Sequence, residues 1–133
     1  VDKKSLLNTP PTFSIYVLKL VTDWMIAIGG IKYFEEKSIR QSSRLYEQLD
    51  SYSDFIILPV NDYSKSRSNI IFKFKNEDLE KKFLIEATEK GILGLNGHRS
   101  EGGIRISLYN SITDEMVNYL SEFMEKFFAD NEK

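Results

Sequence analysis

The chain has 133 residues, of which 41% are hydrophobic and 29% are charged, and its formal net charge is −2. This composition is typical of one globular domain and too apolar for a disordered chain, and the negative net charge means that any site for an anion or a nucleic acid must be local. The sequence has no cysteine and one histidine, which excludes disulfides and thiolate metal sites, so we expect no metal centre.

Residues 12–28 are predicted to form the first helix. Apolar residues recur there with the 3.6-residue period of a helix and cover most of its circumference. Two prolines precede the segment, Thr12 is expected to cap the helix, and Gly29 with Gly30 is expected to end it. A helix that is apolar on most sides is either central to its domain or packed against a partner.

No apolar run in the sequence approaches the roughly 20 residues that a membrane-spanning helix requires. The longest candidate, residues 13–30, is interrupted by Lys19 and Asp23, and no signal peptide is visible. We therefore expect a cytoplasmic protein with neither a membrane nor a nucleic acid as its partner. The first residue is valine, which indicates a fragment of a longer protein.

Shorter elements follow the first helix. In chain order they are a polar helix over about 31–49, strands over 55–60 and 69–75, a helix over 77–90 capped by Asn76, a strand or extended loop over 92–95, a strand over 103–110 and a helix after Thr113. The inner face of the last helix is expected to carry Met116, Leu120, Phe123, Met124 and Phe127. This order, α-α-β-β-α-β-β-α, predicts an α+β fold with helices packed on a small, mainly antiparallel sheet.

The segment GHRSEGGIR, residues 97–105, gathers the single histidine, two arginines and a glycine pair. The alternation of the following strand turns its isoleucines to the core and Arg105 away from it. His98 and Arg99 lie on the loop that leads to this strand, so three donors can converge on one small volume. Guanidinium and imidazole groups bind phosphate and carboxylate, which predicts a site for a small dianion or trianion. The alternative is a solvated loop, on which Glu101 neutralises an arginine.

A second segment, NTPPTF at residues 8–13, lies at the start of the first helix. Thr9 precedes a proline and is therefore expected to be extended, so that Asn8 and Thr9 present their side chains beside the helix N-terminus. Such an end has unpaired N–H groups and a partial positive charge, and it binds phosphate readily. Simple capping of the helix is the alternative interpretation.

The two segments together carry a resemblance to a known family. NTPPTFSIYVLKLV, followed downstream by KGILGLNGHRSEGGIRISLYN, resembles the C-terminal part of the phosphoserine aminotransferase family, in the class V branch of the pyridoxal-phosphate aminotransferases. The resemblance covers nearly the whole chain. It implies the C-terminal domain of a fold-type I aminotransferase, in which residues 1–30 are a leading segment and long interface helix from the junction with a large domain, and residues 31–133 are the small domain.

The resemblance also implies a role for each candidate residue. Asn8 and Thr9 match residues that reach across a homodimer to the phosphate of pyridoxal phosphate in the other subunit. His98 and Arg99 match the residues that hold the substrate phosphate, and Arg105 matches the arginine that holds the substrate carboxylate. The family's Schiff-base lysine lies upstream, and no lysine here lies in a stretch that resembles its motif, so this chain is expected to contain no catalytic residue.

The activity implied for the whole protein is the transfer of an amino group from glutamate to 3-phosphohydroxypyruvate, which gives phosphoserine and 2-oxoglutarate in serine biosynthesis. The chain alone is expected to be inactive. Two alternatives stay open: a class V aminotransferase or lyase with another substrate, and a non-catalytic domain that binds a small anion or a partner protein. The adjacent cations His98 and Arg99 argue against the first alternative, whereas the missing lysine is compatible with the second.

Overall fold

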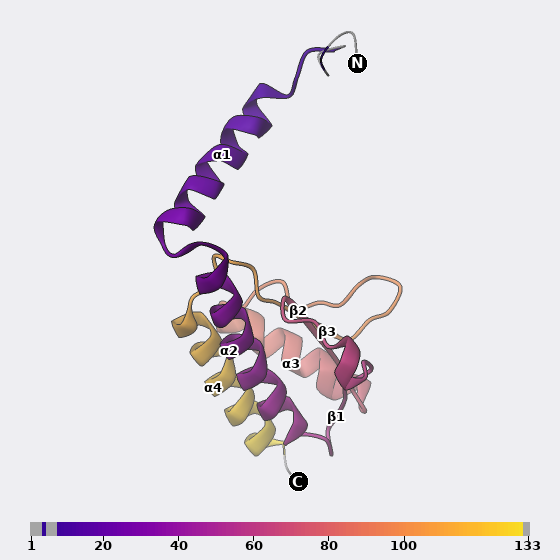
Figure 1. Ribbon diagram of the computed structural model, residues 1–133. Coiled ribbons are helices and arrows are strands. Elements are labelled where there is room, and N and C mark those ends of the chain that lie inside the picture. Colours follow the sequence, from indigo (N-terminus) through magenta and orange to yellow (C-terminus); the bar gives the residue numbers. More distant parts are fainter. Residues whose placement is uncertain (1–3, 5–7, 132–133) are drawn as a thin grey trace. The chain divides into compact units, whose positions relative to one another are not determined.

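The computed structural model describes Lys4 and residues 8–131 of the chain (Figure 1). Its elements are α1 (Thr12–Ala27), α2 (Gly30–Asp50), β1 (Ile56–Ile57), the short 3-10 helix η1 (Asp62–Ser64), β2 (Asn69–Phe74), α3 (Glu77–Glu89), β3 (Ile104–Ser107) and α4 (Asp114–Asp130). The chain divides into two compact units, residues 1–36 and residues 37–133. The predicted α+β class is confirmed.

Helix α1 in the first unit exposes its apolar surface. None of its residues is buried, and the ring of Trp24 packs against that of Phe34 with the ring centroids 5.5 Å apart. The large exposed apolar residues of α1 are Phe13, Ile15, Tyr16, Val17, Leu18, Leu20, Val21, Trp24 and Ile26. Both interpretations of this helix, a central place in a domain and packing against a partner, stay predictions.

The boundaries of α1 agree with the predicted segment to within one residue. Thr12, however, does not cap the helix. It is the first helical residue, and its N–H donates to the Pro10 carbonyl at 2.8 Å, so the N-cap position falls to Pro11, whose side chain has no acceptor. Within the described part of the chain no helix by itself is long and apolar enough to span a membrane, and α1 and α2 meet that length and composition only together, as a bent pair.

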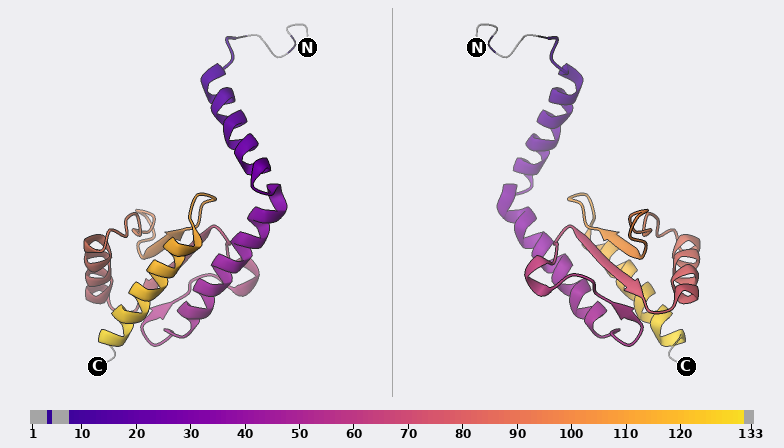
Figure 2. Two further views of the ribbon diagram at one scale, coloured as in Figure 1. Left: turned by 90° about the vertical axis from the view of Figure 1, so that its left-hand side faces the viewer. Right: turned by 90° about the vertical axis from the view of Figure 1, so that its right-hand side faces the viewer.

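The second unit is built on a three-stranded antiparallel sheet in the order β1-β2-β3. Side chains of β2 alternate between its two faces, so that Ile70, Phe72 and Phe74 are buried. These side chains meet all three helices of the unit in a single core, and Figure 2 shows α2 and α4 side by side behind β2. Among the described residues of this unit, no α-helix covers the opposite face, which carries Ile71 and Arg105.

Aromatic rings form the centre of this core. The ring centroid of Phe74 lies 5.2 Å from that of Phe83 on α3, 6.1 Å from that of Phe127 on α4 and 5.7 Å from that of Phe128. Each such ring, removed from water, stabilises the fold by about 1.5–3 kcal/mol. The sheet is thus held rigidly from its inner face, which fixes the position of side chains on its outer face.

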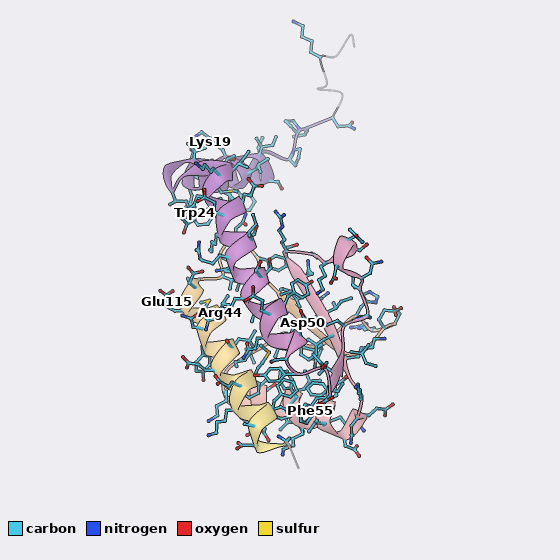
Figure 3. The ribbon with its side chains drawn as sticks, turned by 60° about the horizontal axis from the view of Figure 1, so that its bottom comes forward. Lys19, Trp24, Arg44, Asp50, Phe55 and Glu115 are labelled. Carbon is cyan, nitrogen blue, oxygen red and sulfur yellow. The ribbon has the colours of Figure 1, made fainter. Side chains whose placement is uncertain are left out.

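Polar contacts join α2 to the start of α4. Arg40 donates to Asp114 Oδ2 at 2.8 Å, and Gln41 donates to Asp114 Oδ1 at 2.8 Å. One turn further on, Arg44 donates to Asn118, and Arg44 lies between the α2 and α4 ribbons in Figure 3. The Gln41 amide, and after it Arg40, hold the pKa of Asp114 below its usual value, so the carboxylate is ionised under most conditions.

The predicted helix caps of the second unit are confirmed. Asn76 accepts from the N–H groups of Asp78 and Leu79 at 2.8 and 3.3 Å, and Thr113 accepts from the N–H of Met116 at 3.3 Å. Both caps depend on chemistry within three residues of the cap position, so that they can be predicted from sequence.

Three predicted features of this unit need correction. The strand predicted over 55–60 shrinks to Ile56–Ile57, because Pro59 lacks the N–H that would extend the ladder. The strand predicted over 103–110 shrinks to Ile104–Ser107, while residues 92–95 take the second of their two predicted forms, a loop, in which Gly94 has a φ of 78°. Met116 is 55% exposed and lies at the edge of the buried stripe of α4, in which Val117 and Phe128 belong instead.

Candidate anion-binding site

The loop at residues 97–103 is closed by its own backbone. The Gly97 N–H donates to the Gly103 carbonyl at 2.8 Å, and the N–H groups of Glu101 and Gly102 both donate to the His98 carbonyl, at 3.0 and 2.9 Å. A Cβ atom on Gly97 would lie 1.9 Å from the Gly102 oxygen. Gly103 has a φ of 73°, and a Cβ there would lie 2.8 Å from the Phe72 oxygen. Gly97 and Gly103 are therefore required by close backbone contacts, whereas a Cβ on Gly102 would meet no atom within 4 Å.

A cavity of about 180 Å³ lies between this loop, β2 and β3. It is smaller than the ~300–1,000 Å³ of a drug-sized ligand site and has room for a small anionic group. Its lining residues are Pro59, Ile71, Phe72, Lys73, Gly97, His98, Glu101, Gly102, Ile104 and Arg105. Two of the three predicted substrate-binding residues, His98 and Arg105, thus lie on one cavity.

Arg105 is half-buried, and its position on β3 pairs with Ile71 on the face that the helices leave open. Its Nε atom is buried and has no hydrogen-bond partner among the described residues. A buried donor without an acceptor costs about 1–3 kcal/mol. This N–H group is consequently placed to donate to an acceptor that a ligand would supply.

His98 is held on the loop through one of its two ring nitrogens. Its Nδ1 lies 2.9 Å from Ser100 Oγ and accepts from the Ser100 N–H at 3.3 Å, while Ser100 Oγ also contacts Glu101 Oε1 at 3.3 Å. Because a backbone N–H donates to Nδ1, the neutral ring carries its proton on Nε2. Nε2 hydrogen-bonds to no other described residue, so it is available to donate to an anion.

Arg99 is placed differently from the other two candidates. It is exposed, it does not line the cavity, and it makes no ion pair or hydrogen bond within the described ranges. The structure therefore brings His98 and Arg105 together but leaves Arg99 on the outside of the loop. The assignment of Arg99 to a substrate phosphate stays a prediction.

Asn8 and Thr9 lie in the first unit, just before α1, and both are exposed. No side chain caps the N-terminus of α1, and neither Asn8 nor Thr9 hydrogen-bonds to another residue in the described part of the chain. Of the N–H groups in the first helical turn, that of Thr12 is bonded to the Pro10 carbonyl, and no side chain caps the others. Their assignment to a cofactor phosphate also stays a prediction.

Sequence reasoning missed Lys73 and gave Glu101 no part in the cavity. Lys73 lies on β2, half-buried, on the same face as Ile71. The alternation of the strand could have shown that Lys73 faces away from the core. The pairing of β2 with β3, which brings Lys73 to the glycine loop, depends on contacts about 30 residues apart in sequence and leaves no local signal.

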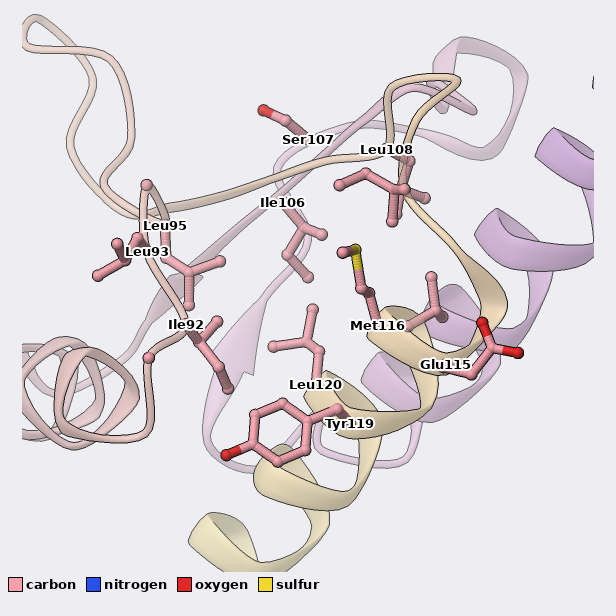
Figure 4. A pocket seen from close by; sticks show the side chains of 14 residues that line it. Ile92, Leu93, Leu95, Ile106, Ser107, Leu108, Glu115, Met116, Tyr119 and Leu120 are labelled. Atoms are coloured by element: carbon pink, nitrogen blue, oxygen red, sulfur yellow. The ribbon is translucent and has the colours of Figure 1, made fainter.

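A second, larger cavity of about 510 Å³ lies between residues 91–95, the end of β3 and α4. In Figure 4 the apolar side chains of Ile92 and Leu95 face Met116 and Leu120 of α4 across it. The hydroxyl of Tyr119, beside this cavity, donates to the Lys90 carbonyl at 3.0 Å. The cavity has no convergent polar donors, so it does not suit an anion. In the described residues there is also no group of three metal-ligating side chains.

A guanidinium from β3, an ammonium group from β2 and an imidazole from the loop thus line one cavity of this small α+β domain. Residues 2–120 match the model of the family Aminotransferase class-V, and the chain belongs to this family. The resemblance seen in the sequence is thereby confirmed.

The relatives of the chain are more specific. It is 47% identical over 132 residues to the phosphoserine aminotransferase of Streptococcus agalactiae, and this match covers 98% of the chain and 36% of the relative. It is 44% identical over 123 residues to the phosphoserine aminotransferase of Geobacillus kaustophilus, and this match covers 92% of the chain and 34% of the relative. The solved phosphoserine aminotransferase from Bacillus circulans subsp. alkalophilus has a TM-score of 0.91 and 36% identity over 98% of the chain and 36% of that structure. A structure of pyridoxal-phosphate-bound phosphoserine aminotransferase from Trichomonas vaginalis has a TM-score of 0.84 and 30% identity over 93% and 36%. The chain thus spans about 35% of the length of the relatives it matches.

Proposed function

We propose that this chain is the substrate-anion-binding part of a phosphoserine aminotransferase. The whole enzyme would transfer the amino group of glutamate to 3-phosphohydroxypyruvate and yield phosphoserine and 2-oxoglutarate, a step of serine biosynthesis. The observation that carries the proposal is the buried, unpaired Arg105 Nε in a cavity that His98 also lines. The likeness of the chain to phosphoserine aminotransferases at 40–47% identity supports it.

Both substrates and both products of this reaction carry a carboxylate, and one substrate, 3-phosphohydroxypyruvate, and one product, phosphoserine, also carry a phosphate. Arg105 lies on the edge strand β3, where its position pairs with Ile71 of the central strand β2, and its planar guanidinium can pair with a carboxylate through two parallel hydrogen bonds. His98 would donate from Nε2 to the phosphate, and Arg99, on the same loop, would add a second donor. A substrate bound at both ends is fixed in orientation, and each charge-assisted hydrogen bond contributes about 1.5–3 kcal/mol.

The cofactor of the proposed enzyme is pyridoxal phosphate. When bound, it supplies the carbonyl group that carries the amino group from one substrate to the other. The N-terminus of α1, a helix of 16 residues, fits a phosphate group because no side chain caps it, although the Thr12 N–H is already bonded to the Pro10 carbonyl. Asn8 and Thr9 would hold the cofactor phosphate there from the other subunit of a homodimer, as the resemblance implies.

The two parts of the chain would have different tasks. Residues 1–30 would form the leading segment and interface helix, and residues 31–133 the small domain that holds the substrate. The exposed apolar surface of α1 supports a role at an interface. We also propose that the enzyme is cytoplasmic and acts on small molecules, without a nucleic acid or a membrane as its partner.

The proposal is tested with the full-length protein that contains this chain, in an assay of 2-oxoglutarate formation from glutamate and 3-phosphohydroxypyruvate. Arg105→Ala should raise the KM of both substrates at least tenfold and leave the visible absorbance of the cofactor unchanged. The double variant with His98→Ala and Arg99→Ala should weaken the binding of phosphorylated substrates far more than the binding of unphosphorylated analogues. Undiminished activity of Arg105→Ala would refute the carboxylate role, and equal losses on both kinds of substrate would refute the phosphate role.

A further inference from the structure

Lys73 is the third positively chargeable side chain on the anion cavity. It lies on β2, in the same face of the sheet as Ile71, which pairs directly with Arg105. Lys73 and Arg105 are therefore diagonal neighbours on adjacent strands, a separation that long side chains bridge. The Lys73 side chain also passes close to Gly103, because a Cβ on that glycine would lie 2.9 Å from the Lys73 Cγ. The absence of a side chain at Gly103 thus leaves the space that Lys73 occupies.

The ammonium group of Lys73 has no counter-ion in the described part of the chain. Other lysines do have one, such as Lys65, which lies 2.9 Å from Asp62, and Lys81, which lies 3.4 Å from Asp78. Lys73 instead is half-buried on a cavity with Arg105 and His98. Positive groups that share a small, partly desolvated space repel one another unless an anion lies between them.

Glu101 contributes a negative charge to the same cavity. A carboxylate there repels a bound anion. If the His98 imidazole is neutral, the positive charge of Arg105 and the negative charge of Glu101 cancel. With these two residues alone, the cavity would have no net electrostatic attraction for phosphate. Lys73 adds one positive charge and restores that attraction.

We propose that Lys73 is a further anion-binding residue of this site, which offsets Glu101 and sets the preference of the cavity for a doubly charged phosphate group. This inference rests on the proposed function for the identity of the natural ligand, a phosphorylated keto acid or amino acid. It does not depend on the transamination reaction itself. The probe that isolates it is inorganic phosphate, which has the charge of the ligand's phosphate group and none of its other parts.

The test is isothermal titration of the full-length protein with inorganic phosphate at pH 8, where the dianion predominates. Lys73→Gln should weaken phosphate binding about tenfold, the loss expected for one charge-assisted contact, and Lys73→Arg should restore most of it. Glu101→Gln should tighten binding severalfold, and the double variant Lys73→Gln with Glu101→Gln should return close to the wild-type affinity. The matched control is Lys75→Gln, because Lys75 is an exposed lysine two residues along the chain that does not line the cavity.

The outcomes separate this inference from the proposed function. If Lys73→Gln binds phosphate as tightly as the wild type, or if the wild type binds none, the inference is overturned. An equal loss in Lys73→Gln and Lys75→Gln would also overturn it, because the effect would then be one of overall charge. If phosphate binding depends on Lys73 but the full-length protein does not transaminate 3-phosphohydroxypyruvate, the proposed function fails and the role of Lys73 stands.

Discussion

Very short contacts decide which positions of the glycine loop and its neighbourhood must be glycine. A Cβ on Gly97 would lie 1.9 Å from the Gly102 oxygen, whereas a Cβ on Gly94, only three residues earlier, would meet no atom within 4 Å. Both positions are glycines, but only the first is excluded from change by space. The loop that carries His98 therefore tolerates no side chain at its first residue.

We expect Gly97→Ala to destabilise the protein by about 1–3 kcal/mol, the usual cost of forcing an atom into a packed position, and to abolish phosphate binding. Thermal unfolding and isothermal titration measure the two effects. Gly94→Ala is the matched control. It should lower the free energy of unfolding by about 1 kcal/mol, because an alanine must adopt the positive φ of 78°, and it should bind phosphate normally. Normal phosphate binding by Gly97→Ala would contradict the expectation that a Cβ at residue 97 collides with the Gly102 oxygen and distorts the loop.

The sequence predicts the residues of the site unequally. The direction of Arg105 follows from the alternation of one strand, and the convergence of His98 with it follows from the short distance along the chain. Lys73 could not be predicted, because its approach to the loop results from the register between β2 and β3. Arg99 shows the opposite failure, since adjacency in sequence to His98 does not bring its side chain onto the cavity.

At the scale of elements, the contact between α2 and α4 contains a carboxylate whose ionisation is coupled to folding. Asp114 accepts from Gln41 and Arg40, and its pKa in the folded state is held below its usual value. A carboxyl group with a lowered pKa in the folded state stabilises that state at pH values above its unfolded pKa of about 3.9, and this contribution is lost as the pH falls through the folded pKa.

Asp114→Asn should therefore flatten the acid side of the stability profile. The free energy of unfolding, measured by urea denaturation between pH 7 and pH 3, should fall less steeply below pH 4 in the variant than in the wild type. The difference at pH 7 should be no more than about 1 kcal/mol, because the Asp114 side chain is 47% exposed. Asp54→Asn replaces an exposed carboxylate and serves as control. Parallel profiles for Asp114→Asn and the wild type would disprove the coupling.

Helix α1 leads to a different expectation, because it exposes apolar side chains without burying any. Exposed apolar surface of this extent drives association, so the 133-residue chain by itself should self-associate. Leu18→Ser combined with Ile26→Ser should lower the sedimentation coefficient toward that of a monomer. Tyr63→Ser, which changes an isolated and fully exposed ring, should leave it unaltered. A monomeric wild-type chain would contradict this expectation.

Elements also differ in how well the sequence predicts them. The long helices and their caps at Asn76 and Thr113 follow from local patterns, and their predicted boundaries agree with the structure. The bounds of the short strands β1 and β3 do not, because strand length is decided by which distant residues are available for pairing. Periodicity likewise could not decide between burial of Met116 and of its neighbour Val117.

At the scale of the whole molecule, the chain holds residues that suit the binding of a substrate and none that the resemblance assigns to the cofactor carbonyl. A lysine that reacts with an aldehyde must be a neutral amine. Lys65 is not of this kind, because its hydrogen bond to Asp62 raises its pKa. The resemblance places the lysine that would supply this chemistry upstream of this chain.

This division of tasks is tested by reduction with borohydride in the presence of pyridoxal phosphate. We expect the 133-residue chain to gain no stoichiometric label at a single lysine, and the full-length protein to gain one label per subunit. Mass spectrometry of the digested proteins counts and locates the labels. A single lysine of this chain labelled in full yield would disprove the assignment of the carbonyl chemistry to another region.

The backbone closure between Gly97 and Gly103 has a consequence for how such domains diverge. The Gly97 N–H donates to the Gly103 carbonyl, and the N–H groups of Glu101 and Gly102 donate to the His98 carbonyl. Adding or deleting one residue between Gly97 and Gly103 would break every one of those bonds at once. The number of residues between His98 and Arg105 is therefore expected to stay constant. Loops on the far side of the sheet can lengthen without affecting these hydrogen bonds. Related domains can therefore differ in their outer loops and still keep the same distance between the imidazole and the guanidinium that bind a ligand.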